Sequence, residues 1–259
     1  MKIDIDILKD ISRSAGKAIM EIYKKQDFNI RKKEDNTLVT DADMLANDII
    51  VAGLEKAYPQ VMIIAEESTN PAYELRKDAE FLWCVDPLDG TKGFVRQSGE
   101  FCINIALLHN NIPMFGIIYA PFLQTWYYGG KNYGAFKQIY VNDPEKINVN
   151  DNYFGGLTIA TSRNSKLDEN DKVLESLDIA EIIKMGSAVK FGLIAEGRAD
   201  LYYRKKGTME WDTAAGQAIV EAAGGLVTDI SGNPLRYNKE DFANPTFLCM
   251  ASPHVLKHT

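Results

Sequence analysis

Two short apolar runs that end abruptly in acidic residues place the strongest constraint on the fold of this chain. The run 61–65 (Val-Met-Ile-Ile-Ala) is followed directly by Glu66 and Glu67, and the run 81–85 (Phe-Leu-Trp-Cys-Val) by the segment 86–91 (Asp-Pro-Leu-Asp-Gly-Thr). Short continuous apolar runs of this kind predict buried strands. Because ligands of α/β sheets bind at the carboxyl ends of strands, we expect one sheet edge to present both acidic clusters.

The first half of the chain adds helices before these strands and a meander after them. Apolar residues at helical spacing predict a helix over 5–25 and another over 43–57, preceded by the capping residues Thr40 and Asp41. Runs of β-forming residues separated by Asn, Pro and Gly predict an antiparallel meander within 100–137.

A polar stretch at 142–156 is the best candidate boundary between two parts of the chain. Beyond it, strands are expected at 157–161, 199–203, 226–229 and 246–251, and helices at 168–177, 187–197 and 211–223. This order predicts a mixed α/β (α+β) protein made of an N-terminal part, residues 1–145, and a C-terminal part, residues 146–259.

The charge balance limits the partners of this protein. The chain has 259 residues, with 29 Lys and Arg against 36 Asp and Glu, so its formal net charge is −7. An acidic balance argues against a general nucleic-acid binder, which would show basic patches. The net negative charge would repel an anionic substrate, so the binding site of such a substrate would need a local excess of positive charge.

The cysteines and the hydropathy pattern indicate a cytoplasmic protein. The three cysteines are odd in number, form no CxxC pair and lie in apolar stretches, so we expect reduced thiols, with neither disulfides nor a zinc site. No apolar run approaches the roughly 18 residues of a membrane-spanning helix. A peripheral contact with the inner membrane stays open, as does the choice between a monomer and a homodimer.

The acidic clusters are suited to magnesium-dependent phosphoryl chemistry. Mg²⁺ prefers oxygen ligands, and the chain has only three histidines, two of them within its last six residues. Asp86 and Asp89 flank a proline-stiffened turn, where the carbonyl of Leu88 adds another oxygen. Gly90 permits close approach of the backbone, and a helix beginning at Thr91 would offer free N–H groups to a phosphate.

Each of these pieces also has an ordinary structural explanation. A Glu-Glu pair is usually solvated, a Pro-Asp-Gly segment is usually a plain turn, and Asp212, after Trp211, is suited to capping a helix. A functional role for the acidic residues is nevertheless favoured, because both clusters stand at the ends of apolar strands, where ligands of α/β sheets bind.

Taken in order, the acidic pieces form a known signature. The pieces are Asp43, Glu66-Glu67, the segment 86–91, Trp211-Asp212 and Gly224-Gly225. This order resembles the signature of the lithium-sensitive, magnesium-dependent phosphatases, a superfamily that includes inositol monophosphatases, fructose-1,6-bisphosphatases and 3′(2′),5′-bisphosphate nucleotidases. The resemblance covers essentially the whole chain and implies a layered αβαβα fold of the inositol monophosphatase type.

Within that superfamily, several short stretches of sequence most closely resemble the bacterial 3′(2′),5′-bisphosphate nucleotidases. The matching stretches are 89–94, 99–108, 116–121, 190–202 and 208–225. One position departs from that branch, because Gly93 stands where Glu is usual. The Thr-Asn-Phe of inositol monophosphatases is absent after Gly90.

The resemblance implies specific roles. Glu66, Asp86, Asp89, Asp212 and the Leu88 carbonyl would ligate two or three Mg²⁺ ions, and Li⁺ would inhibit the enzyme. Thr91 and Asp43 would orient and help deprotonate the attacking water.

The implied substrate is adenosine 3′,5′-bisphosphate (PAP), a by-product of sulfate assimilation, which would be hydrolysed to AMP; the related 3′-phosphoadenosine 5′-phosphosulfate (PAPS) is a further candidate. The candidate substrate contacts are Glu66, Asp89, Gly90, Thr91, Ser162, Arg163, Gly186, Ser187, Lys190 and Asp212. Gly186 and Ser187 open an expected helix, so their N–H groups are candidates for holding a second phosphate. Lys92 and Arg204 are further cations whose ordinary explanation, a solvated surface charge, stays open.

Two other functions stay open at this point. One is an inositol monophosphatase-like enzyme acting on a sugar or polyol phosphate, and the other is a non-catalytic sensor that has lost turnover. Two or three Mg²⁺ ions would bring positive charge to the acidic residues, so the metal-loaded site would attract phosphate despite the net charge of the chain.

Overall fold

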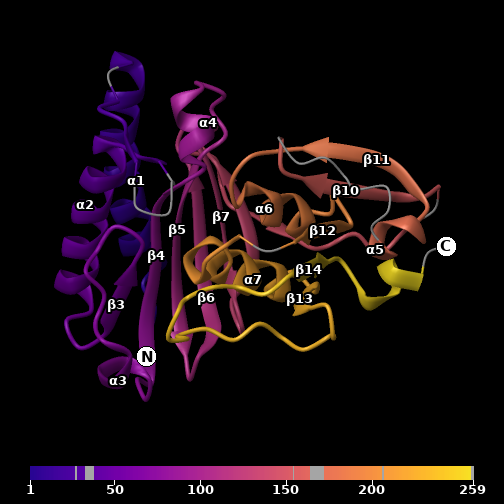
Figure 1. Cartoon of the computed structure of the whole chain (residues 1–259). Helices are drawn as coiled ribbons and strands as arrows, with labels where there is room; N and C mark the ends of the chain where they lie inside the picture. Colours follow the sequence, from indigo (N-terminus) through magenta and orange to yellow (C-terminus); the bar gives the residue numbers. More distant parts are fainter. Residues whose placement is uncertain (27, 33–37, 154, 164–171, 206, 258–259) are drawn as a thin grey trace.

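A computed structural model describes residues 1–26, 28–32, 38–153, 155–163, 172–205 and 207–257. Its layers alternate between helices and sheets (Figure 1). A pair of long helices covers one sheet, two shorter helices lie between this sheet and a second one, and a short helix packs on the outer side of the second sheet. The αβαβα layering expected from the resemblance is therefore present.

The first sheet has seven strands in chain order. They are β3 (Met62–Ala65), β4 (Phe81–Asp89), β5 (Cys102–His109), β6 (Ile112–Ala120), β7 (Thr125–Gly130), β8 (Gly134–Ile139) and β9 (Glu145–Ile147). β3 and β4 are parallel, and every later pair is antiparallel, which confirms the predicted meander.

The second sheet has the order β11-β10-β12-β14-β13. Its strands are β10 (Leu157–Thr161), β11 (Ile179–Lys184), β12 (Leu201–Arg204), β13 (Leu226–Asp229) and β14 (Phe247–Met250). β10 runs parallel to both of its neighbours, β11 and β12, so the carboxyl ends of these three strands lie at one edge. A separate small hairpin pairs β1 (Arg31–Lys32) with β2 (Leu38–Val39).

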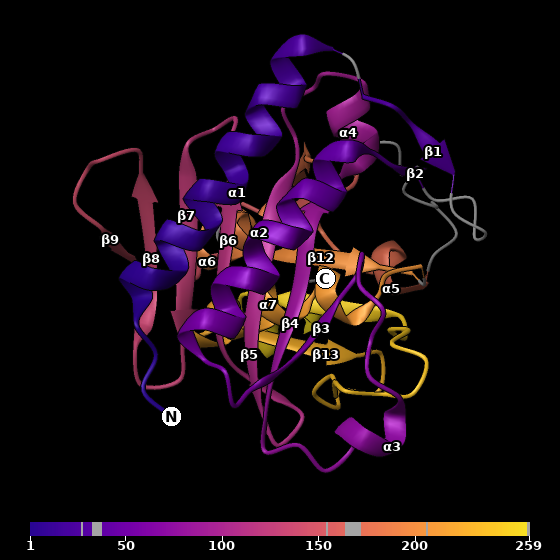
Figure 2. The same cartoon turned by 90° about the vertical axis from the view of Figure 1, so that its left-hand side faces the viewer.

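The two long helices are α1 (Ile5–Lys25) and α2 (Asp41–Ala57), which lie side by side across the first sheet (Figure 2). The middle layer consists of α6 (Val189–Ala195) and α7 (Ala214–Ala222), and the outer helix is α5 (Lys172–Glu175). Short helices α3 (Tyr73–Arg76) and α4 (Thr91–Val95) and the 3-10 turns η1 (Glu210–Asp212) and η2 (Pro253–Lys257) complete the described elements.

Strand β4 shows why the first sheet is buried on both faces. Trp83 and Val85 point into the core shared with α1 and α2, whereas Leu82 and Cys84 point into the core shared with α6 and α7. Because side chains alternate along a strand, a continuous apolar run supplies both cores at once. The apolar run 81–85 therefore fixes β4 at the centre of the molecule and delivers Asp86 to its end.

Several predicted boundaries are wrong. α2 begins two residues early, at Asp41, with Thr40 as its N-cap. β4 continues past Asp86 to Asp89 through an irregular register with β5. The helix expected at 211–223 is divided into η1 and α7, with Thr213 between them.

Other elements differ in extent. α6 covers Val189–Ala195 rather than 187–197, and β9 and β11 were not predicted. Part of the helix expected at 168–177 lies outside the described residues. β9 crosses the expected boundary between residues 145 and 146, and the division into two parts stays a prediction.

Among the described residues, no helix combines the length and apolar character needed to cross a membrane. The cysteines Cys84, Cys102 and Cys249 are free and buried, as expected.

Candidate active site

Three acidic side chains from three separate elements converge at one sheet edge. Carboxylate oxygens of Glu66, Asp86 and Asp212 all lie within 4.8 Å of one another. Glu66 follows β3, and its backbone N–H donates to the carbonyl of Val85 at 3.1 Å, so the parallel pairing of β3 and β4 sets it beside Asp86. Asp212 arrives from η1, which contacts β4 across the layers.

Asp86 is the most enclosed of the three. Its side chain is 1% exposed, and Oδ1 accepts the N–H of Leu88 at 2.9 Å. Oδ2 is buried and has no hydrogen-bond partner among the described residues. A buried carboxylate oxygen without a donor is costly unless a cation compensates it, so this atom fits a metal ligand.

Asp89 joins this cluster to the middle layer. Its Oδ2 accepts the backbone N–H of Ala188, just before α6, and the Sγ of Cys102 lies 3.9 Å from the same oxygen. Asp89 lines a pocket of about 390 Å³ together with Glu66, Asp86 and Asp212. The pocket also includes Leu88, Thr91 and Lys92, so it contains every residue predicted to ligate metal.

Burial and mutual repulsion raise the pKa values of Asp86 and Asp212 well above the usual carboxyl range. Burial also raises the pKa of Asp89, although the nearby ammonium of Lys190 acts in the opposite direction. Carboxylates grouped in one pocket in this way stay ionised together only when a compensating cation is near. The all-oxygen donor set suits a hard divalent ion such as Mg²⁺.

Thr91 and Asp43 are in hydrogen-bond contact beside the acids. The Thr91 hydroxyl lies 3.2 Å from Asp43 Oδ1 and 3.3 Å from the carbonyl of Leu88. Asp43 Oδ2 accepts the N–H of Thr40 at 2.8 Å and its hydroxyl at 2.5 Å. Burial raises the pKa of Asp43 to about 6, so it is mostly ionised at neutral pH and can accept from Thr91.

The turn between β4 and α4 depends on Gly90. Its φ is +91°, and a Cβ there would lie 2.6 Å from the carbonyl oxygen of Glu100. A larger residue would therefore be strained and would displace the segment that follows α4.

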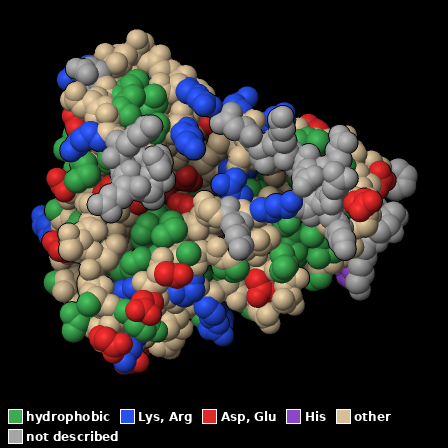
Figure 3. Space-filling model, viewed as in Figure 1, with side chains coloured by type: hydrophobic (Ala, Val, Ile, Leu, Met, Phe, Trp, Pro, Cys, Tyr) green, Lys and Arg blue, Asp and Glu red, His purple; other side chains and the backbone are tan. Residues whose placement is uncertain are grey.

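A second pocket of about 360 Å³ adjoins the acids and is lined by cations. Lys92, Arg96, Arg163 and Arg204 belong to its lining, and Figure 3 shows Lys and Arg side chains around the hollow between the two sheets. Ser162 and Arg163 follow β10, whereas Arg204 ends β12, so parallel strands present them at the same edge. Nη1 of Arg204 donates to the hydroxyl of Ser162 at 3.3 Å, and its buried Nε has no partner among the described residues.

The Gly186-Ser187 turn is held differently from the expectation. The helix begins later, at Val189, and the N–H of Gly186 donates to Glu100 Oε2 at 3.1 Å instead of pointing at an open anion site. Lys190 is 3% exposed and donates to the carbonyl of Ser187 at 2.5 Å, so it supports the turn from within. Burial lowers the pKa of Lys190 to about 8.

Glu100 is a site residue that the sequence analysis did not single out. Its carboxylate accepts Nε of Arg163 at 2.8 Å and forms a second contact with Nη2 of the same guanidinium. This contact lowers the pKa of Glu100. Glu100 lies in the stretch 99–108 that carries the resemblance, but no strand-end pattern marks it as a site residue.

The layered fold and the carboxylate cluster together are typical of metal-dependent phosphatases. The family model described as "Inositol monophosphatase family" matches residues 4–257, and the chain belongs to this family. The structure of an IMPase from Thermotoga maritima matches with a TM-score of 0.80 and 28% identity, covering 98% of this chain and 95% of that one.

The more similar relatives share one name. The 3′(2′),5′-bisphosphate nucleotidase CysQ of Buchnera aphidicola is 41% identical over 251 residues, which cover 95% of this chain and 93% of the relative. The protein of the same name from Escherichia coli K12 is 38% identical, covering 94% of this chain and 98% of the relative. A crystal structure of CysQ from Bacteroides thetaiotaomicron matches with a TM-score of 0.81 and 36% identity, covering 94% of this chain and 95% of that one.

Proposed function

We propose that this protein is a magnesium-dependent phosphoric monoester hydrolase that removes the 3′-phosphate of PAP to give AMP, with PAPS as a second substrate. The observation that carries the proposal is the acidic cluster of Glu66, Asp86 and Asp212 beside a pocket lined by cations. The CysQ names of relatives that match nearly the whole chain support the bisphosphate substrate. The proposed cellular role is PAP recycling in sulfate assimilation.

The acids would hold the metal. Glu66, Asp86, Asp89, Asp212 and the Leu88 carbonyl are the proposed ligands of two or three Mg²⁺ ions. Bound Mg²⁺ would supply a nucleophilic water at neutral pH and neutralise the leaving oxygen. Li⁺ is the proposed inhibitor.

The Thr91–Asp43 pair would orient the attacking water. The ionised Asp43 accepts the hydrogen of the Thr91 hydroxyl, which leaves the Thr91 oxygen free to accept a hydrogen from water. The Thr91 hydroxyl also lies close to the carbonyl of the proposed ligand Leu88, so the water would be held beside the metal. This arrangement supports the proposed role of Thr91 and Asp43 in activating the nucleophile.

The cation-lined pocket would bind the second phosphate. Nε of Arg204 is buried and has no partner within the described part of the chain, and Ser162, Ser187 and Arg163 line the same pocket. A guanidinium suits phosphate because it donates in a planar fork. A substrate with two phosphates would therefore place one at the acids and the other among these cations.

A substrate panel tests the proposal. Phosphate release from PAP, PAPS, inositol 1-phosphate and fructose 1,6-bisphosphate is measured with Mg²⁺, with chelator, and with added Li⁺. We expect the highest kcat/KM for PAP, no activity with chelator, and inhibition by Li⁺. Turnover of inositol 1-phosphate faster than of PAP would instead favour the sugar or polyol phosphatase suggested by the IMPase structures.

Two coarser proposals accompany this function. We propose a cytoplasmic location, which fractionation would test by following the protein between the soluble and membrane fractions. We also propose a monomer or homodimer, which light scattering would distinguish.

A further inference from the structure

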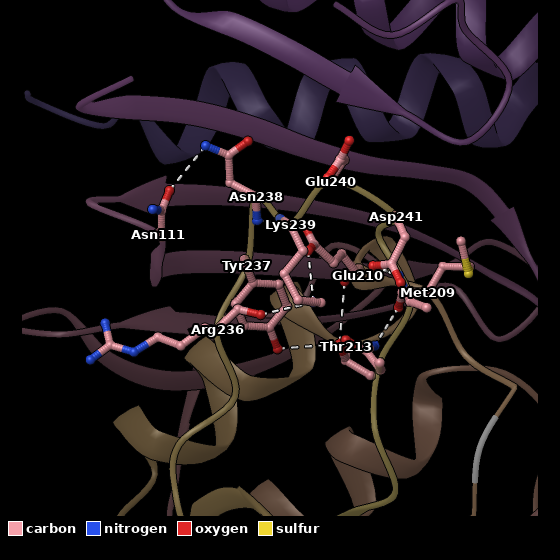
Figure 4. Close-up of polar contacts among 12 residues, drawn as sticks. Asn111, Met209, Glu210, Thr213, Arg236, Tyr237, Asn238, Lys239, Glu240 and Asp241 are labelled. Atoms are coloured by element: carbon pink, nitrogen blue, oxygen red, sulfur yellow. Dashed lines mark hydrogen bonds and ion pairs between the residues drawn. The ribbon is translucent and has the colours of Figure 1, made fainter. Parts of the chain in front are cut away.

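Residues 237–244 form a segment that lies beside the turn carrying Asp212, and Ala243 of this segment forms an isolated β-bridge with Met209. Figure 4 shows polar contacts between the two, with Glu210 and Lys239 among the labelled residues. The backbone N–H of Glu210 donates to a carbonyl of this segment at 2.9 Å. The side-chain amide of Asn244 donates to the carbonyl of Met209 at 2.6 Å. The turn is therefore fastened to the segment immediately before Asp212.

The carboxylate of Glu210 makes the strongest of these connections. It is fully buried and accepts the backbone N–H groups of Asn238 at 2.6 Å and Lys239 at 2.8 Å. The ammonium of Lys239 donates to the same carboxylate at 2.7 Å. A buried charge is tolerated when it is paired and hydrogen-bonded in this way, so Glu210 anchors the turn two residues from Asp212.

Arg76 holds the same segment through a further set of hydrogen bonds. Its guanidinium is 1% exposed and donates to Asn238 Oδ1 at 2.6 Å and to the carbonyl of Lys239 at 2.9 Å. It also lies 4.1 Å from the centre of the Phe242 ring. The side chain of Asn238 donates back to the carbonyl of Arg76 at 2.7 Å, so the contact is made from both sides.

The connection from Arg76 continues to the strand end that bears Glu66. Nε of Arg76 donates to the carbonyl of Pro71 at 3.1 Å. The neighbouring Asn70 accepts the N–H of Ala65 at 2.8 Å and donates to its carbonyl at 3.0 Å. Hydrogen bonds, together with the peptide bond between Asn70 and Pro71, thus connect the residue before Glu66 to Arg76.

We propose that Arg76, Asn238 and Glu210 are positioning residues that set the separation between the metal ligands Glu66 and Asp212. These two ligands belong to different layers, and no short stretch of chain joins them. The buried side chains of Arg76, Asn238 and Glu210, continued through Pro71 and Asn70, supply a link between them. The inference rests on the proposed metal site and adds residues to it that touch neither metal nor substrate.

Such a link has a physical purpose in this site. The carboxylates of Glu66, Asp86 and Asp212 repel one another, and the repulsion is strong because water is partly excluded. Metal affinity depends on ligand oxygens being held close to their final geometry before the ion arrives. A rigid connection that resists the repulsion would therefore raise the affinity of the apo protein for Mg²⁺.

Metal binding separates this role from a general contribution to stability. The full-length variants Arg76→Met and Glu210→Gln each remove donors or charge from the connection, and Arg76→Lys retains the charge with fewer donors. Lys9→Met is a matched control, because Lys9 is also a buried cation, 8% exposed, but lies in the long helix α1 against Gln138 and Tyr128. Mg²⁺ affinity is measured by calorimetry, and the Tm is measured in chelator.

We expect Arg76→Met and Glu210→Gln to bind Mg²⁺ about tenfold more weakly or worse, the scale seen for residues that orient metal ligands. The Mg²⁺ affinity of Arg76→Lys should lie between that of these two variants and that of wild type. If Arg76→Met does not fold, the comparison of Arg76→Lys with wild type tests the proposal. Lys9→Met should have a lower Tm than wild type but the same Mg²⁺ affinity.

Two results would overturn the inference in distinguishable ways. Unchanged Mg²⁺ affinity in the folded variants, beside a lower Tm, would reduce the connection to a structural one and leave the proposed function intact. If wild type binds no more Mg²⁺ than Asp86→Asn, the proposed metal site fails, and this inference fails with it.

Discussion

The acids and the cations of this site are built in different ways. The acid basin, defined as Glu66, Asp86, Asp89 and Asp212, is attached to strand ends and turns that the core surrounds. The cationic rim, defined as Lys92, Arg163 and Arg204, lies in the adjoining pocket, and Arg163 has 55% of its side chain exposed. We infer that the basin determines the reaction, which is common to the family, and that the rim selects the substrate.

The largest effect should follow a change in the basin. Asp212→Asn removes one ligand charge, so we expect kcat/KM to fall about 10³-fold on every substrate, the scale of losing a preorganised electrostatic partner. In chelator the Tm should be no lower than that of wild type, because the neutral amide relieves repulsion from Asp89 and Glu66.

Asp229→Asn is the control, because Asp229 lies in a turn at the end of β13, outside the pockets described. If Asp212→Asn turns over substrate as fast as wild type, Asp212 is not one of the acids that the reaction needs. A loss confined to PAP would contradict the division between basin and rim.

A smaller effect, again on every substrate, is expected at the edge of the basin. Thr91→Ala removes the hydroxyl that contacts Asp43, and kcat should fall about 10²-fold with little change in KM, the lower range for acid–base assistance. Thr91→Ser should recover most of the rate. A variant that changes KM and leaves kcat intact would place Thr91 in binding instead.

Substitution in the rim should distinguish between substrates. Arg204→Met removes the guanidinium and its contact with Ser162, so the KM for PAP should rise about tenfold, the equivalent of one charge-assisted hydrogen bond. The KM for adenosine 3′-monophosphate, which lacks the second phosphate, should stay near its wild-type value. Arg198→Met is the control, because Arg198 is exposed and lies outside the pocket. An equal rise in KM for both substrates would show that Arg204 acts at the acid basin and not on the second phosphate.

The basin was predictable from the sequence because its residues are marked locally. Asp86 and Glu66 follow apolar strands, and the parallel pairing of β3 and β4 brings them together as expected. Thr91 and Asp43, which the resemblance assigns together to the attacking water, are in hydrogen-bond contact. The assignment of these residues to metal binding and catalysis stays a prediction.

Contacts between distant segments were not predictable in this way. No periodicity links Arg76 to Glu210, and no strand end marks Glu100 as the partner of Gly186. Asp200, an acid outside the signature, is another example: it is 2% exposed and accepts the N–H of Thr158 at 2.7 Å. Such pairings depend on how layers pack, and a single sequence records packing only through the apolar pattern.

Glu100 offers the finest test of the division between basin and rim, because it is an acid within the cationic pocket. Its carboxylate accepts hydrogen bonds from Arg163 and from the N–H of Gly186, two donors that would otherwise be available to a substrate phosphate. Glu100→Gln keeps the shape but removes the charge, so the KM for PAP should fall about threefold, as expected for one exposed ion pair, and less at high salt. The exposed Glu80→Gln is the control. A KM that rises instead would mean that Glu100 holds Arg163 in its binding position, and the rim would then depend on an acid just as the basin depends on a cation.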